Sequence, residues 1–159
     1  MSFAICDQGS ASPFTGLRVL GDYGVRRALL IVVEQAALPY ESVAATPAAH
    51  RGVAMLYEEG QGTRVTEVRQ YPDVSPDAVP EVARLEVAEL SAGHPGARLV
   101  LSDSLARVWP DHPDHTPAPA GQPTTGVWWQ VAGAREGAVL VGDYDRELRY
   151  LCFAVVEVD

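Results

Sequence analysis

The sequence carries one pattern twice, close to its two ends. Residues 17–34 read LRVLGDYGVRRALLIVVE, and residues 139–157 read VLVGDYDRELRYLCFAVVE. Each copy has a short apolar run, then Gly-Asp-Tyr, then an arginine-containing stretch, then a long apolar run that contains Val-Val-Glu. Gly and Asp favour turns, and apolar runs on both sides of a turn are typical of a β-hairpin. The pattern therefore predicts two similar hairpins, related by an approximate twofold and sharing one sheet.

The rest of the chain predicts further strands and few helices. Strands are expected at residues 3–6, 40–45, 53–58, 63–71, 97–101 and 127–131. A helix is expected over residues 80–90, opened by Pro80 and ended by Ser91-Ala92-Gly93, and a turn of helix over 102–109. The run 25–34 also fits helical spacing, but its β-branched residues favour a strand. Residues 110–125 contain five prolines and are expected to form a long loop or lid.

These elements predict a fold class. We expect one α+β domain over residues 1–159, with a mostly antiparallel, curved or barrel-like sheet and one or two helices. A hydrophobic content of 47% is sufficient for a packed core. No apolar run reaches the roughly 20 residues that span a bilayer, and the first residues do not resemble a signal peptide. We therefore expect a cytoplasmic protein that does not bind membranes.

Net charge and residue usage exclude several classes of function. The net charge is −9, which disfavours nucleic-acid binding and favours a partner with a basic or mixed surface. All twelve basic residues are arginine, so lysine nucleophiles, Schiff bases and a P-loop lysine are excluded. The two cysteines, Cys6 and Cys152, lie in apolar runs and are expected to be buried free thiols. No motif calls for a cofactor.

Two Asp-Tyr pairs, Asp22-Tyr23 and Asp143-Tyr144, come from the repeated pattern. If the hairpins share a sheet, both carboxylates could meet at a pocket mouth and act as acid and base or bind a cation. The alternative is that each Asp caps its own turn while the Tyr packs beside it.

The Pro-rich loop contains weak metal-ligand candidates. Asp111, His112, Asp114 and His115 lie within five residues, a density typical of metal-binding tracts. A proline-rich loop does not by itself hold such ligands in place, so no metal is expected and a surface loop is the preferred interpretation.

A carboxylate series gives a remote alternative. FAICDQGSAS places Asp7 after an apolar run, Glu81 starts the expected helix, and RLVLSDS places Asp103 after another apolar run. This order resembles that of the ribonuclease H-like nucleases, and the resemblance implies a two-metal nuclease site, to which Asp143 would be added. The chain departs from that family in the long interval between Asp7 and Glu81, in its final strand and in the lack of a basic surface.

The tryptophans mark a candidate binding surface. Trp109, Trp128 and Trp129 flank the Pro-rich loop. On a strand, Trp128 and Trp129 would point to opposite faces, so one would fill the core and the other would meet a lid, a ligand or a partner.

Two functions remain. The first is a small acidic protein that docks a partner protein, in the manner of inhibitors and immunity proteins. The second is a small-molecule binding protein or enzyme with its ligand under the 110–125 loop. Because no nucleophile and base pair can be read from the sequence, whether the chain is an enzyme stays open and the first function is preferred. Its binding candidates are Asp22, Tyr23, Trp109, Trp128, Trp129, Asp143 and Tyr144.

Overall fold

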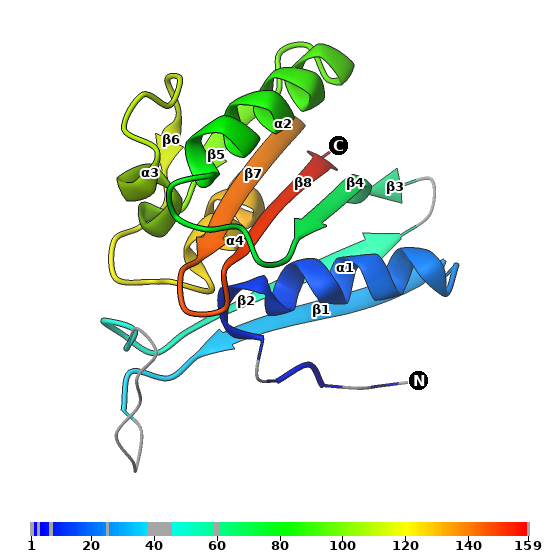
Figure 1. Cartoon of the computed structure of the whole chain (residues 1–159). Helices are drawn as coiled ribbons and strands as arrows, with labels where there is room; N and C mark the ends of the chain where they lie inside the picture. The colour runs from blue at the N-terminus through cyan, green and yellow to red at the C-terminus, as the bar shows by residue number, and fades with distance from the viewer. Residues whose placement is uncertain are drawn as a thin grey trace.

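The computed structural model describes residues 2, 4–6, 8–24, 26–37, 46–58 and 61–158 (Figure 1). In chain order the elements are η1 (Gly9–Ala11), α1 (Ser12–Asp22), β1 (Arg27–Glu34), β2 (Arg51–Glu58), β3 (Gln61–Gly62), β4 (Arg64–Tyr71), α2 (Val79–Gly93), β5 (Arg98–Leu101), α3 (Asp103–Val108), β6 (Thr116–Pro117), α4 (Gly126–Ala132), β7 (Gly137–Asp145) and β8 (Tyr150–Val158). The predicted α+β class is confirmed. No helix among the described residues has the length and apolar character needed to cross a bilayer.

The strands form two sheets. One has the order β1-β2-β3, and the other has the order β4-β8-β7-β5-β6. Most pairings are antiparallel, as predicted, but β5 runs parallel to both β6 and β7. In the larger sheet β8 is therefore antiparallel to its neighbours on both sides.

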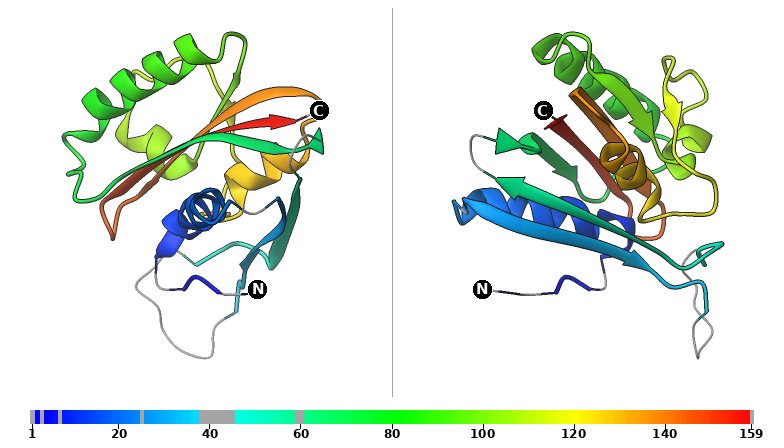
Figure 2. Two further views of the ribbon diagram at one scale, coloured as in Figure 1. Left: turned by 90° about the vertical axis from the view of Figure 1, so that its right-hand side faces the viewer. Right: turned by 180° about the vertical axis from the view of Figure 1, so that it is seen from behind.

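Helices and sheets alternate in layers (Figure 2). Helices α2 and α3 cover one face of the five-stranded sheet, while α1 and α4 lie between its other face and the three-stranded sheet. The core between the sheets includes Phe14, Leu17, Val32, Met55, Trp128, Val141 and Ala154. The core under α2 includes Val79, Ala83, Leu90, Leu105, Leu140 and Phe153. In the described part of the chain, no layer covers the outer side of the three-stranded sheet.

The predicted N-terminal hairpin is wrong. Residues 17–20 belong to helix α1, which Pro13 opens and which ends before Gly24, whose φ of 57° is left-handed. Phe14, Leu17 and Leu20 lie three residues apart and place one apolar face on the core. The strand expected within 25–34 is confirmed as β1, but it pairs with β2 instead.

The predicted C-terminal hairpin is confirmed, although its turn lies elsewhere. Strands β7 and β8 pair from Gly137↔Val158 to Asp145↔Tyr150, so the chain turns over residues 146–149. Gly142-Asp143-Tyr144 lies inside β7 and is not a turn. Because β1 and β7 belong to different sheets, the expected sharing of one sheet by the two ends is also wrong.

Two other strand predictions are wrong. Residues 127–131 lie in helix α4, in which Trp128 and Val131, three residues apart, both face the core. Residues 4–6 form no strand. The strand expected at 40–45 lies outside the described residues. The predictions at 53–58, 63–71, 80–90, 97–101 and 102–109 are confirmed by β2, β4, α2, β5 and α3.

Candidate functional site

A buried row of polar side chains crosses the centre of the five-stranded sheet. Gln70 of β4 is in register with Cys152 of β8, and Cys152 is in register with Asp143 of β7. Residues opposite each other on neighbouring strands project from the same face. That face is the one covered by η1 and α1, because Cys152 packs in the core between the two sheets. An amide, a thiol and a carboxyl are therefore placed side by side between two layers.

Asp143 is the most unusual member of this row. Its side chain is 2% exposed, and neither carboxylate oxygen has a hydrogen-bond partner among the described residues. Burial raises the pKa of Asp143 to about 6, although the nearby hydroxyls of Ser10 and Ser102 act in the opposite direction. A carboxyl with this pKa changes charge close to neutral pH, which is the property that a general acid or base requires.

The other two members are held in less reactive states. Gln70 donates from Nε2 to Thr15 Oγ1 at 3.0 Å and to Cys152 Sγ at 3.8 Å, and its Oε1 is buried without a partner among the described residues. Thr15 in turn donates to Gln8 Oε1 at 2.6 Å. Burial, and secondly the negative charge of Asp143, raise the pKa of the Cys152 thiol well above its ordinary value. Cys152 is therefore a protonated thiol at neutral pH and a poor nucleophile.

Asp145 holds segment η1 in place over the polar row. Its Oδ2 accepts from the backbone N–H of Ser10 at 2.9 Å, and its Oδ1 accepts from the N–H of Leu148 at 3.0 Å. Gly9 approaches so closely that a Cβ there would lie 1.9 Å from Asp145 Oδ2, and its φ is +51°. Only glycine satisfies both conditions without strain. Segment η1 is thereby held against β7 directly above Asp143.

Ser102 closes the row at β5. Its N–H donates to Gly142 O at 3.0 Å, and its hydroxyl accepts from Leu105 N at 3.1 Å as the N-cap of α3. Sequence reasoning singled out Asp143 but missed Ser10, Gln70 and Ser102, because only the sheet register and the layer above it bring them together.

A second buried polar group joins the two layers. The Glu34 carboxylate of β1 accepts from Thr124 N at 2.5 Å and from the Thr125 hydroxyl, and it is 7% exposed. Gln122 Oε1 lies 3.1 Å from the same hydroxyl oxygen. These bonds attach the end of β1 to the start of α4. The buried Glu34 carboxylate therefore has a structural role.

The two predicted Asp-Tyr pairs do not meet. Asp22 lies at the C-terminal end of α1, whereas Asp143 lies under η1, which precedes the N-terminal end of that helix. The eleven residues of α1 span about 16 Å. Tyr23 is 67% exposed, while Tyr144 is fully buried and donates to Val74 O at 2.8 Å on the opposite side of the sheet from Asp143. The idea that symmetry joins both carboxylates at one pocket is therefore wrong.

The tryptophans divide between core and surface. Trp128 and Trp109 are buried, and Trp128 packs edge-on against Phe14 with ring centroids 4.9 Å apart. Trp129 is 48% exposed, and the Arg51 guanidinium lies 4.6 Å from its ring centroid. The expected division of Trp128 and Trp129 between core and surface is confirmed, but a helix produces it.

The metal-ligand candidates are not assembled into a site. The rings of His112 and His115 lie edge to face at 4.3 Å. Within the described ranges, no three His, Cys, Asp or Glu side chains converge as a metal site requires, and this includes Asp111 and Asp114. In the carboxylate series, Glu81 pairs with Arg84 and Asp103 pairs with Arg107 on exposed helix surfaces. Asp7 lies outside the described residues.

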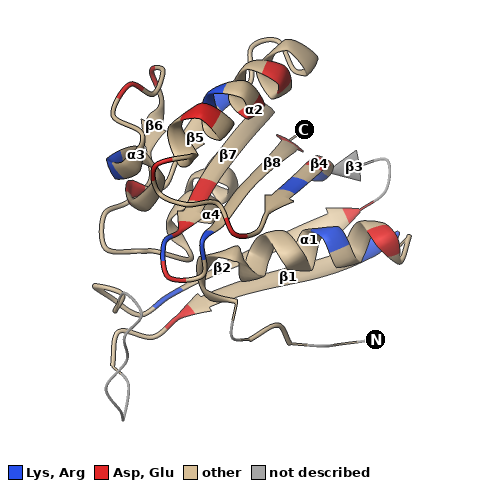
Figure 3. Cartoon of the chain, viewed as in Figure 1, with Lys and Arg blue, Asp and Glu red and all other residues tan. Residues whose placement is uncertain are grey.

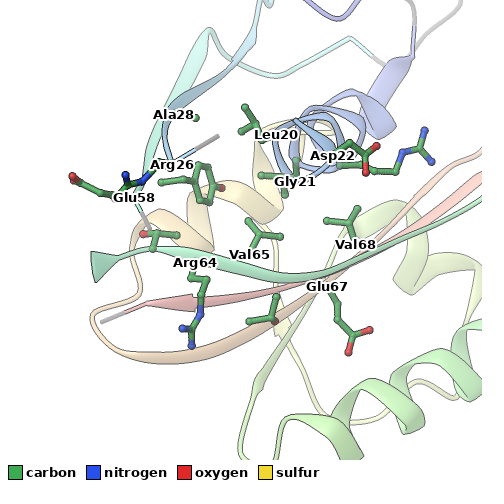
Figure 4. Close-up of a pocket in the computed structure, with 15 residues that line it drawn as sticks. Leu20, Gly21, Asp22, Arg26, Ala28, Glu58, Arg64, Val65, Glu67 and Val68 are labelled. Atoms are coloured by element: carbon green, nitrogen blue, oxygen red, sulfur yellow. The ribbon is translucent and has the colours of Figure 1, made fainter. Parts of the chain in front are cut away.

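A cleft of about 460 Å³ opens between α1, the adjoining ends of β1 and β2, and β4 (Figure 4). Leu20, Ala28, Val65 and Val68 supply apolar lining, and Asp22 lies at its edge. None of residues 110–125 lines it. Figure 4 shows Arg64 and Glu67 directed away from the cleft on the other side of β4, where Arg64 pairs with Glu157 and Glu67 pairs with Arg69.

The outer side of the three-stranded sheet is apolar, and none of the described segments covers it. Leu29, Ile31 and Val33 of β1 are 58%, 59% and 67% exposed, and Leu56 of β2, opposite Leu29, is 45% exposed. We call these four residues the outer face. Charged residues lie at the ends of β1 and β2, and the strands between are uncharged (Figure 3). Isolated exposed leucines are common, but a contiguous apolar strip is typical of a binding surface.

Comparison with solved structures shows the fold. The tetronic acid condensing enzyme AbyA1 superposes with a TM-score of 0.67 at 13% identity, over 95% of this chain and 68% of that one. The ishigamide ketosynthase/chain length factor superposes with a TM-score of 0.58 at 18% identity, over 94% of this chain and 55% of that one. Neither a protein-family model nor a curated protein matches the sequence. The chain thus has the fold of part of these larger proteins.

Proposed function

We propose that this protein docks a partner protein through the outer face. The observation that supports this is the exposure of Leu29, Ile31, Val33 and Leu56 on one side of the sheet, while the other side is packed in the core. The run Ala28–Val33 is apolar at every position. A strand with one face exposed to solvent alternates apolar and polar residues, whereas a strand buried on both faces is apolar throughout.

Among its described residues, the central polar row offers no activated nucleophile. Its thiol is held protonated, and the described part of the row contains no imidazole that could act as a base. His50 and His94 contact Ala36 and Glu67, and His112 and His115 lie in the Pro-rich loop. A nucleophile needs a base within hydrogen-bond reach. Among the described residues of the row Asp143 is the one candidate base, and neither of its oxygens is hydrogen-bonded to the thiol.

The test compares two exposed apolar positions. The tagged chain is used to recover partners from its native host as wild type, as Ile31→Asp and as Leu85→Asp. Leu85 is 52% exposed on helix α2, so it matches Ile31 in exposure but lies outside the outer face. We expect the same partner with wild type and Leu85→Asp, and at least a tenfold lower yield with Ile31→Asp. Equal recovery with all three, or no specific partner, would contradict the proposal.

A second candidate function is the binding or conversion of a small molecule. It is favoured by the Asp143 carboxyl, which is buried and unpartnered among the described residues, and by the names of the fold neighbours, a condensing enzyme and a ketosynthase/chain length factor. A thermal-shift screen of carboxylic acids, amides and thioesters tests it. A ligand that stabilises the wild type but not Asp143→Asn would support this function.

A further inference from the structure

The chain contains one structural unit twice. Helix α1 is followed by the antiparallel pair β1 and β2, and helix α4 is followed by the antiparallel pair β7 and β8. Both helices lie in the same middle layer, and each packs its strand pair against the core between the sheets (Figure 2). The two units are therefore equivalent in element order and in layer, with β1 corresponding to β7 and β2 to β8.

The second unit is complete on its outer side. Strand β5 lies parallel against the free side of β7, and β4 lies antiparallel against β8. Helices α2 and α3 cover the face that points away from the core between the sheets, so Leu140, Tyr144 and Leu151 are at most 1% exposed. Segment 64–117 supplies all of these covering elements.

The first unit lacks the same cover among the described residues. Strand β1 is the edge of its sheet, and no described strand pairs with its second side. Its outward side chains are more than half exposed, although they are as apolar as those of β7. An eight-residue edge strand with an apolar face is a template for pairing with another chain.

We propose that the partner is a second, different polypeptide that adds a strand parallel to the edge of β1 and lays an amphipathic helix across the outer face. This inference rests on the proposed function and specifies its mode of binding. The proposed binding mode is the same as the way in which β5, α2 and α3 cover β7 and β8 in this molecule.

The size of the outer face requires the added strand. Two strands of eight residues present a strip of about 26 Å by about 10 Å, which is less than the roughly 800 Å² that each partner buries in a stable complex. A strand paired along β1 and contacts beyond the strip would bury the remaining area.

Charge and topology both argue against a second copy as the occupant. Each copy carries a net charge of −9, so two copies repel each other, whereas a basic or mixed partner surface is attracted. A second copy also has no spare unit to offer, because its own segment 64–117 is already packed on its own β7 and β8.

Site-specific cross-linking tests the mode of binding. A photoreactive phenylalanine analogue replaces Ile31 on the outer face or, as the control, Leu85 on α2, and the full chain is expressed in the native host. Cross-linked peptides are then sequenced. The complex is also reconstituted by co-expression, and amide hydrogen exchange of β1 is compared with that of the free chain.

We expect position 31, and not position 85, to cross-link to a helix of a different protein. We also expect exchange of the β1 amides to slow at least tenfold in the complex. Cross-links from position 31 to another copy of this chain would overturn the inference. A complex that leaves β1 exchange unchanged would overturn it too, while the proposed docking function would survive. Failure to recover any partner would overturn both.

Discussion

Asp143 shows how burial sets the charge of a single side chain. Its carboxyl lies between two packed layers, with Asp145 two residues away on the same strand and Cys152 opposite. The carboxylate form loses its hydration there and gains no hydrogen bond from the described residues. The neutral form is therefore favoured up to a pH well above that of an exposed aspartate.

Replacement of Asp143 by asparagine tests the raised pKa through its effect on the free energy of unfolding. The pKa rises from 3.8 in the unfolded reference to about 6 in the folded protein. The folded state thus binds the proton more tightly, so its contribution to stability is complete below pH 4 and is lost as the pH rises through 6. We expect Asp143→Asn to become the more stable protein over that interval, by on the order of 3 kcal/mol at pH 7.5. Urea unfolding at four pH values between 4 and 7.5 measures the difference, and a difference independent of pH would contradict it.

The two cysteines differ in reactivity for the same reason. Cys6 is exposed, contrary to the sequence prediction, and Cys152 is buried as predicted. Burial raises the pKa of the Cys152 thiol and also blocks access to reagents. We expect one thiol to react with a disulfide reagent within minutes in the native protein and the second only after unfolding. Cys6→Ser should abolish the fast reaction and Cys152→Ser should preserve it; two fast thiols in the wild type would show that β8 is accessible.

At the scale of elements, the attachment of β1 to α4 depends on Glu34. Its carboxylate accepts bonds from Thr124 N and the Thr125 hydroxyl in a buried position. Because such bonds to a charged group contribute about 1.5–3 kcal/mol, we expect Glu34→Ala to lower the free energy of unfolding by about 3 kcal/mol. Glu34→Gln keeps one acceptor oxygen and should cost less. Glu81→Ala, which removes an exposed pair with Arg84, serves as the control and should change stability by less than about 0.5 kcal/mol.

The elements that could be predicted from the sequence are those with an unambiguous local signal. Helix α2 has a proline at its start and a stop at Gly93, and β7 and β8 are apolar runs separated by a polar turn. Helices α1 and α4 were missed because short segments rich in valine, leucine and tryptophan fit either periodicity. Their helical state follows from packing between two sheets, which is not a local property. Asp143 could be identified from the sequence, but its buried neighbours required the strand register.

Identical tripeptides took different conformations for the same reason. Gly21-Asp22-Tyr23 ends a helix, whereas Gly142-Asp143-Tyr144 lies in the middle of a strand. The repeated pattern aligned β1 with β8 through their shared Val-Val-Glu, while the three-dimensional repeat relates β1 to β7. The sequence therefore indicated a duplication but assigned the wrong strands to each other.

At the scale of the whole molecule, the alternation of helix, sheet, helix and sheet leaves the two sheets unequally protected. Strand β8 is hydrogen-bonded on both sides and buried on both faces, whereas the described residues pair with one side of β1 and cover one of its faces. We expect the amides of β8 to exchange most slowly with solvent and those of β1 fastest among the long strands. Hydrogen exchange followed by mass spectrometry measures this order. Slow exchange throughout β1 in the free chain would mean that its second side is already occupied.

The outer face also governs how separate molecules of this protein behave toward one another. At low ionic strength the net charge of −9 is unscreened, so neighbouring molecules repel each other and their outer faces stay apart. Added salt, or acidification toward the isoelectric point, removes that repulsion but not the hydrophobic attraction between two outer faces. We therefore expect the protein to stay dispersed at low ionic strength and neutral pH, and to associate through the outer face when salt or acid removes the repulsion.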